Sequence, residues 1–377
     1  MNSSVGGMNE KLGQRWYLLF DWTLFILVIT ISTIGVVFVY SATFSSESEY
    51  FQRLYLKQIE WHIIGLIIAG FIASMDYKTL ERPAYLIYGI FIILLIAVLV
   101  KARVVSGSQR WLSIGGFNMQ PSELVKVVLV ITLARFYDDR RDKSNMGFKE
   151  LTFPAIIMAI PALLIYKQPD LGTSIILGII FVCMSFLFGI KKRTIMTIVT
   201  AALVALPVLW VNLKPYQKNR VLALLDPASD PLGIGYHTIQ SKIAIGSGGV
   251  WGKGLFAGTQ SKLNFLPEKH TDFIFSVYAE EVGFIGTLIL LALYLLLFLR
   301  MIDIVLKAND RGGSLMAIGC TTMIAFHFFY NAAMTLGMTP IVGIPMPFFS
   351  YGGSSLIANY TAMGILMSIH MRRYSND

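Results

Sequence analysis

The sequence predicts an all-α polytopic integral membrane protein with about ten transmembrane helices. Of its 377 residues, 55% are hydrophobic and only 14% are charged. The apolar residues form long blocks rather than amphipathic patterns. A helix needs roughly 20 apolar residues to cross a bilayer, where lipid offers the backbone no hydrogen-bond partners. These observations favour a bundle of spanning helices over a soluble globule.

Ten segments approach that length. In chain order they are Tyr17–Tyr40, Trp61–Met75, Ala84–Val100, Ser122–Tyr137, Leu151–Tyr166, Gly172–Ile190, Thr194–Asn212, Phe273–Met301, Ser314–Leu336 and Gly352–Met371. We therefore expect one transmembrane domain, residues 17–373, between an N-terminal tail of residues 1–16 and a C-terminal tail of residues 374–377.

Local signals support individual spans. The first block is too long for a signal peptide and lacks a convincing cleavage site, so we expect it to remain as an anchor. Pro121 opens the fourth span, where a proline is tolerated early in a helix. Pro154, Pro161 and Pro207 interrupt later spans, which membrane helices accept better than soluble ones. The small residues that begin the last span would allow close helix packing.

Charge predicts the orientation. If both termini are cytoplasmic, 17 Lys and Arg residues lie on the cytoplasmic side and 6 lie in short outer loops. This bias follows the positive-inside rule. The formal net charge of +9 then reflects topology and anionic lipid, so the lipid bilayer is the expected partner and a nucleic acid is not. The two cysteines, Cys183 and Cys320, fall inside spans and suit apolar packing, not a disulfide or a metal site.

One connection is exceptionally long. Residues 213–271 contain aromatic residues among many glycines, which argues against disorder, and we expect short helices at the outer interface. The glycine-rich run from Gly246 to Ala257 fails as a phosphate loop because Gly254 replaces the Ser or Thr that should follow Lys253. It could contact a ligand closely or simply turn the chain, and both interpretations remain open.

Charged residues at membrane boundaries are the candidate site. Glu123 and Lys126 are spaced to pair on one helix face, either as a structural ion pair or at the active site. Asp170 and Asp272 each precede a span and could cap its helix. For Asp170 we favour the cap. For Asp272, which follows Lys269 and His270, we favour proton transfer, and we expect Glu280 or Glu281 in the same helix to face a polar interior.

Five ordered motifs resemble the SEDS family of shape, elongation, division and sporulation proteins, from about Tyr17 to Arg373. They are Gly107-Ser-Gln-Arg110-Trp111, Gln120-Pro-Ser-Glu123, Gln168-Pro-Asp170-Leu-Gly-Thr, the run from Gly235 through Gln240-Ser-Lys242 to Asp272, and Gly343-Ile-Pro-Met-Pro-Phe-Phe-Ser350-Tyr-Gly-Gly-Ser. The Gln240 motif and Gln168 resemble the elongation members more than the division members.

The resemblance implies a peptidoglycan glycosyltransferase of the bacterial inner membrane. Such an enzyme joins lipid II disaccharides by β-1,4 transfer on the outer face and releases undecaprenyl pyrophosphate. Asp272 maps to the family's essential acidic residue and would be the catalytic base, while Glu123 and Lys126 map to its membrane pair. Cations would bind the departing pyrophosphate; the candidates are Arg110, Lys126, Arg220, Lys242 and Lys269.

The resemblance also implies a class B penicillin-binding protein, a transpeptidase, as partner. A divalent cation, Mg²⁺ or Mn²⁺, could share the work of charge neutralisation, but the sequence shows no ligand cluster for it. Two other functions stay open. A lipid II flippase would use Glu123 and Lys126 to line a path, and a non-catalytic scaffold for a transpeptidase would tolerate loss of Asp272.

Overall fold

A computed structural model describes residues 19–46, 48–101, 110–114, 117–140, 146–197, 200, 204, 211, 215–227, 233–262, 265–266 and 268–374. The predicted N-terminal tail and most of the seventh predicted span, Thr194–Asn212, lie outside these residues. The helices are α3 (Trp22–Thr43), α4 (Glu49–Gln52), α5 (Leu54–Ser74), α6 (Tyr77–Glu81), α7 (Ala84–Lys101), α8 (Pro121–Asp138), α9 (Phe148–Lys167), α10 (Leu171–Phe188), α12 (Pro215–Leu225), α13 (Ile234–Ser247), α14 (Thr259–Lys262), α15 (Ile274–Lys307), α16 (Arg311–Thr335) and α17 (Gly353–Met371).

Nine of the ten predicted spans coincide with helices of this structure. Among the described helices, six are long and apolar enough to cross a membrane, and α7 is a shorter apolar helix. The polytopic all-α architecture is therefore confirmed. The one sheet found among the described residues is a small antiparallel pair, β1 (Leu112–Ile114) with β2 (Phe117–Met119), beside the start of α8.

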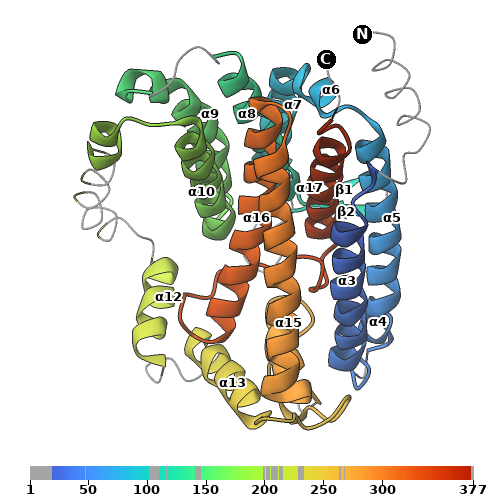
Figure 1. Ribbon diagram of the computed structural model, residues 1–377. Coiled ribbons are helices and arrows are strands. Elements are labelled where there is room, and N and C mark those ends of the chain that lie inside the picture. Colours follow the sequence, from blue (N-terminus) through green and yellow to red (C-terminus); the bar gives the residue numbers. More distant parts are fainter. Residues whose placement is uncertain are drawn as a thin grey trace.

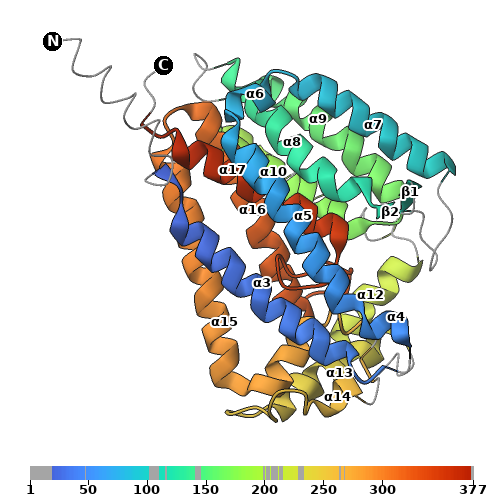
Figure 2. The same cartoon turned by 90° about the vertical axis from the view of Figure 1, so that its right-hand side faces the viewer.

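The helices form a bundle whose centre is α8, α16 and α17 (Figure 1). Helix α17 packs on α5, α8 and α16, whereas α15 packs on α3 and α16. Nearly every residue of α8 is buried, including Glu123 and Lys126, so the charges of these two residues lie inside the protein and not against lipid. Helices α7, α9 and α10 complete the other side of the bundle (Figure 2).

The two ends of the bundle differ. Helices α12, α13 and α14 lie at one end, which we call the loop end, and this confirms the expectation of short helices within residues 213–271. Helix α13 is tied down by Ser241, whose hydroxyl lies 2.7 Å from that of Ser276 on α15 and donates to the carbonyl of Thr335 at 2.6 Å. The opposite end, where α3 begins and α17 finishes, we call the terminal end.

Helix α15 is broken near the loop end. Gly283 has φ 69° and ψ −164°, which no helix contains and which favours glycine. The break admits the glycine-rich loop, because the N–H groups of Lys253 and Gly254 donate to the carbonyls of Glu280 and Glu281. This close approach of backbone to backbone explains the glycines as a packing feature. The ligand-contact alternative finds no support in these contacts.

Two buried glutamates hold the same loop. One carboxylate oxygen of Glu280 accepts from the ammonium of Lys253 at 2.7 Å and from the N–H of Thr259 at 2.8 Å. Glu281 accepts from Ser41 on α3 at 2.5 Å and from the N–H of Phe256 at 3.1 Å. Both therefore face a polar interior, as expected for at least one of them. Their role in this structure is to fasten the loop to α3 and α15.

The stretch between α16 and α17 re-enters the bundle. Phe348 and Phe349 are fully buried, and the carbonyl of Phe349 accepts from the amide of Gln58 at 3.1 Å. The hydroxyl of Tyr294 donates to the carbonyl of Pro347 at 2.6 Å. These side chains supply the hydrogen bonds that an irregular backbone needs at membrane depth. These contacts hold this re-entrant stretch inside the bundle.

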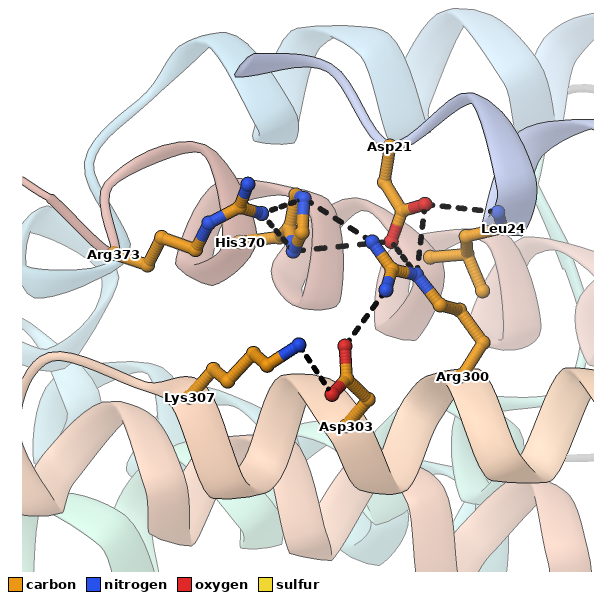
Figure 3. Close-up of polar contacts among 7 residues, drawn as sticks. All are labelled: Asp21, Leu24, Arg300, Asp303, Lys307, His370 and Arg373. Carbon is orange, nitrogen blue, oxygen red and sulfur yellow. Dashed lines mark hydrogen bonds and ion pairs between the residues drawn. The ribbon is translucent and has the colours of Figure 1, made fainter.

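A polar cluster joins three helices at the terminal end (Figure 3). Asp21 caps α3 by accepting from the N–H of Leu24 at 3.0 Å. The same carboxylate accepts from Nε of Arg300 on α15 at 2.9 Å, and His370 of α17 lies 3.9 Å from it. Arg300 also donates to Asp303 at 2.7 Å. One guanidinium thus ties the first and last described spans to α15.

Candidate functional site

Asp272 lies in the last turn before α15. The N-cap of that helix is Phe273, and no side chain caps it. The N–H of Asp272 donates to the carbonyl of Glu268 at 3.1 Å, while its carboxylate lies against Gly343, where an added Cβ would be 3.1 Å from Oδ2. Asp272 is therefore not a helix cap. This removes the structural alternative that the sequence left open.

The surroundings of Asp272 adjust its acidity. Burial, together with the nearby carboxylate of Glu268, raises the pKa of this carboxyl group to about 7. The guanidinium groups of Arg220 and Arg110 act in the opposite direction and lower the pKa. A carboxylate with a pKa close to 7 is suited to accept a proton at neutral pH.

The backbone around Asp272 is fixed to the re-entrant stretch. The side-chain amide of Asn331 on α16 donates to the carbonyl of Asp272 at 2.9 Å and to that of Ile344 at 2.7 Å. The N–H of Tyr351 donates to the carbonyl of His270 at 3.0 Å. Two segments far apart in the sequence therefore form one wall of the site.

Two of the predicted cations, Arg110 and Arg220, act electrostatically on Asp272 from different elements. Arg110, just before β1, donates through Nε to the carbonyl of Gln168 at 3.3 Å and also to that of Pro169, and its Nη1 lies 3.9 Å from Asp170. Arg220 is on α12, and its positive charge also interacts electrostatically with the hydroxyl group of Tyr330 on α16. The structure brings both guanidinium groups toward the catalytic candidate.

Lys269 is on the other side of the same turn. Its side chain is buried, and burial lowers its pKa. Together with Glu268, His270, Leu266, Thr43, Ser46 and Phe51 it lines a cavity of about 200 Å³ between the end of α3 and the turn. Lys269 therefore places a positive charge at this cavity, three residues before Asp272 in the chain.

Lys242 occupies a different place from the other cations. It is exposed on α13, and its side chain packs over Gly337, which follows the end of α16. Within the described part of the chain, no ion pair joins it to Asp272, and it is not among the charged groups that shift the pKa of Asp272. A role in substrate binding therefore stays a prediction for this residue.

Glu123 and Lys126 form the predicted pair inside the bundle. The ammonium of Lys126 lies 2.8 Å from the carboxylate of Glu123 and 2.9 Å from Nε2 of His327 on α16. An ammonium group only donates, so Nε2 of His327 must accept and the proton of the neutral ring must be on Nδ1. All three side chains are buried. The pair thus connects α8 to α16 directly below the re-entrant stretch.

The cap predicted for Asp170 is confirmed. Its Oδ1 accepts from the N–H of Thr173 at 3.2 Å, and its Oδ2 accepts from the hydroxyl of Thr173 at 3.0 Å. Among the described residues, no group of three or more His, Cys, Asp or Glu side chains is arranged to hold a metal ion. Cys183 and Cys320 are free thiols.

Sequence reasoning missed His327 and Asn331, and it included Gly343 in a motif without predicting its contact with Asp272. His327 and Asn331 are four residues apart in an apolar helix, which places two polar groups on one face. That spacing could have identified them, since polar residues inside spans are functional candidates by default. Gly343 has φ 74°, and only its contact with Asp272 in three dimensions shows its importance.

Comparisons with known proteins agree with the fold. Residues 21–375 match a family model, FTSW_RODA_SPOVE, described as cell cycle protein. The peptidoglycan glycosyltransferase MrdB of Escherichia coli is 46% identical over 311 residues, which cover 82% of this chain and 84% of the relative. The peptidoglycan glycosyltransferase RodA of Treponema pallidum is 34% identical, with 94% of this chain and 98% of the relative covered.

Solved structures are similar over almost the whole chain. A chain from a peptidoglycan synthase complex, described as coordinating polymerization and crosslinking, has a TM-score of 0.80 and 31% identity, covering 95% of this chain and 99% of that one. The rod shape determining protein RodA of Thermus thermophilus has a TM-score of 0.70 and 28% identity, with coverage of 95% and 98%.

Proposed function

The chain belongs to the FtsW, RodA and SpoVE family of cell cycle proteins, the SEDS family, and from this premise we propose how it polymerises peptidoglycan. It is a peptidoglycan glycosyltransferase close to RodA that makes glycan strands for cell elongation. The proposal concerns its substrate and residues: it joins lipid II units at Asp272 and releases undecaprenyl pyrophosphate.

The reaction needs a base. A hydroxyl oxygen of the acceptor sugar attacks the anomeric carbon of the donor, a new C–O bond forms, and the bond to pyrophosphate breaks. The hydroxyl proton passes to the carboxylate of Asp272. A positioned base contributes roughly 10²- to 10⁴-fold to such a step. A single displacement of this kind inverts the anomeric centre and gives the β-1,4 link.

The reaction needs no second carboxylic acid, because pyrophosphate leaves as a stable anion. A glycosidase differs in this respect, since its leaving group must be protonated. Negative charge that develops on the pyrophosphate calls for cations close to Asp272. Arg110, Arg220 and Lys269 support this role by position, and arginine suits forked contacts with phosphate oxygens.

The observation that carries the proposal is the half-buried carboxylate of Asp272, which caps no helix and is close enough to two guanidinium groups for their charges to lower its pKa. The test is incubation of the purified protein with lipid II, with and without its cognate transpeptidase and a divalent ion. Polymer length is measured on gels. Wild type should make polymer, and the isosteric Asp272→Asn variant should make none while remaining folded.

Two further measurements separate the alternatives. A flippase would move lipid II across reconstituted vesicles without lengthening it. A scaffold would support cell growth with Asp272→Asn in place of the native residue. Polymer from both wild type and Asp272→Asn would remove the base assignment but keep the polymerase.

The partner and the location complete the proposal. The solved complex that couples polymerization to crosslinking supports a class B penicillin-binding protein as the partner of this chain. The multi-pass bundle and the distribution of Lys and Arg support insertion in the bacterial inner membrane with both termini in the cytoplasm and the loop end outside. Lipid II and the growing strand would then meet at Asp272 on the outer side.

A further inference from the structure

We propose that Asn331 is a positioning residue for glycan polymerisation, which braces Asp272 against the re-entrant stretch and connects it to the Glu123–Lys126 pair. The inference rests on the proposed function, because it assigns a role relative to the base at Asp272. It adds a residue on α16 that none of the sequence motifs identified.

The side-chain amide of Asn331 joins two separate backbone segments. A side-chain amide nitrogen has two N–H groups, and here each donates to a different backbone segment, at 2.9 Å to the carbonyl of Asp272 and at 2.7 Å to that of Ile344. The side chain is fully buried. Its oxygen Oδ1 has no hydrogen-bond partner among the described residues. The nitrogen alone therefore accounts for the position of this side chain.

The two carbonyls need this donor. In α15 the first helical hydrogen bonds are accepted by Phe273, so the helix leaves the carbonyl of Asp272 unpaired. A buried carbonyl without a partner is unfavourable, and Asn331 supplies one. Ile344 follows Gly343, the residue against which the carboxylate of Asp272 lies. One amide thus sets the spacing between the backbone that carries the base and the backbone that faces it.

The brace extends to the buried ion pair. His327 lies one turn earlier on the same face of α16 and accepts from Lys126 at 2.9 Å. This contact fixes the rotation of α16 about its axis and hence the direction in which Asn331 points. The Glu123–Lys126 pair then supports the reaction indirectly, through its contact with α16.

A positioning role and a general packing role differ in measurable ways. Movement of Asp272 by about 1 Å can cost 10²-fold in rate with little change in substrate affinity. It should also admit water to the carboxylate and move the acidic limb of the pH profile to lower pH. The charged groups that face Asp272, namely Glu268, Arg220 and Arg110, are all retained in an Asn331 variant. A change in the midpoint would therefore report on the brace.

The experiment compares Asn331→Ala and Asn331→Leu with Asn359→Ala in full-length protein with its transpeptidase partner. Asn331→Leu is used in place of an aspartate variant, because leucine keeps about the size of the side chain, removes the amide donor and adds no charge next to Asp272. Asn359, buried on α17, is a matched control because its Nδ2 has no partner among the described residues. The measurements are kcat and KM for lipid II, the pH midpoint, and hydrogen exchange of peptides covering residues 268–273 and 343–351.

We expect both Asn331 variants to lose about 10²-fold in kcat with KM changed less than about threefold. Their pH midpoint should fall and both peptides should exchange faster, while Asn359→Ala matches wild type. Unchanged kcat, midpoint and exchange in Asn331→Leu would overturn the proposal. If wild type makes no polymer, the proposed function fails, and the exchange data still decide whether Asn331 holds Asp272.

Discussion

At the scale of single residues, the acidity of Asp272 predicts how activity depends on pH. Because burial raises its pKa to about 7, the carboxylate is protonated below that pH and cannot accept the acceptor's proton. Only about one tenth of it is ionised one pH unit below its pKa. Polymerisation should therefore fall about tenfold between pH 7.5 and pH 6, as measured by initial rates with lipid II. A rate that stays flat to pH 5 would contradict the assignment.

The buried pair of Glu123 and Lys126 allows a second prediction. Lys126→Met leaves the carboxylate of Glu123 buried without its counter-ion, which typically costs about 3–5 kcal/mol. The double variant with Glu123→Gln removes both charges and should recover much of that loss. Thermal unfolding of purified protein in detergent measures both. Equal losses for the single and double variants would show that the two charges do not stabilise each other.

At the scale of elements, the break in α15 predicts the effect of a single methyl group. Gly283→Ala would force a side chain into a positive φ and against the backbone nitrogen of Gly252. A left-handed conformation alone costs roughly 1–2 kcal/mol, and the collision with backbone adds to it. The variant should unfold at a lower temperature and lose polymerase activity.

Gly178→Ala is the matched control for this prediction. Gly178 lies within α10, where an added Cβ meets no atom within 4 Å. Alanine favours a helix over glycine by about 1 kcal/mol, so this variant should be at least as stable as wild type. A Gly283→Ala protein as stable as Gly178→Ala would contradict the described conformation of the break.

The elements also show how much the sequence could predict. Long apolar blocks located nine spans, but the second was predicted to begin at Trp61 whereas α5 begins at Leu54. Polar residues lower the hydropathy of the first turns of α5, so they were not included in the predicted span. One of them, Gln58, is buried because its side-chain amide donates to the carbonyl of Phe349. Hydropathy is a local property, and that bond joins residues almost 300 positions apart.

The candidate site was predictable to the same extent. Asp272 was identified by its place in a motif at a membrane boundary, and the pair of Glu123 and Lys126 was identified by its spacing on one helix. The contacts of Asn331 with Asp272 and Ile344 join separate segments, so no periodicity could reveal them. The broken helix is a similar case, because Gly283 differs from a helical glycine only through the loop that packs on it.

At the scale of the whole molecule, the cluster around Arg300 predicts a loss of stability that leaves the chemistry unchanged. Asp21→Ala removes the cap of α3 and a buried partner of Arg300, which should cost about 3–5 kcal/mol. The cluster includes Arg300, near the end of α15, whereas Asp272 precedes the first turn of that helix. The melting temperature should fall while the pH midpoint of polymerisation stays at its wild-type value.

Glu49→Ala provides the comparison for Asp21→Ala. Glu49 pairs with Arg53 in an ion pair whose two side chains are 76% and 68% exposed, and such surface pairs contribute little. Its removal should hardly change the melting temperature. A shifted pH midpoint in Asp21→Ala would mean that the terminal end is coupled to the site.

Arg300 brings the beginning of α3 and the end of α17 to one point, so the first and last described spans end beside each other in space. Chains whose ends meet in this way usually tolerate circular permutation. A short linker from α17 to α3, with new ends opened between α8 and α9, would keep every span in its native direction. The order in which the helices are synthesised could then be changed without altering how they pack.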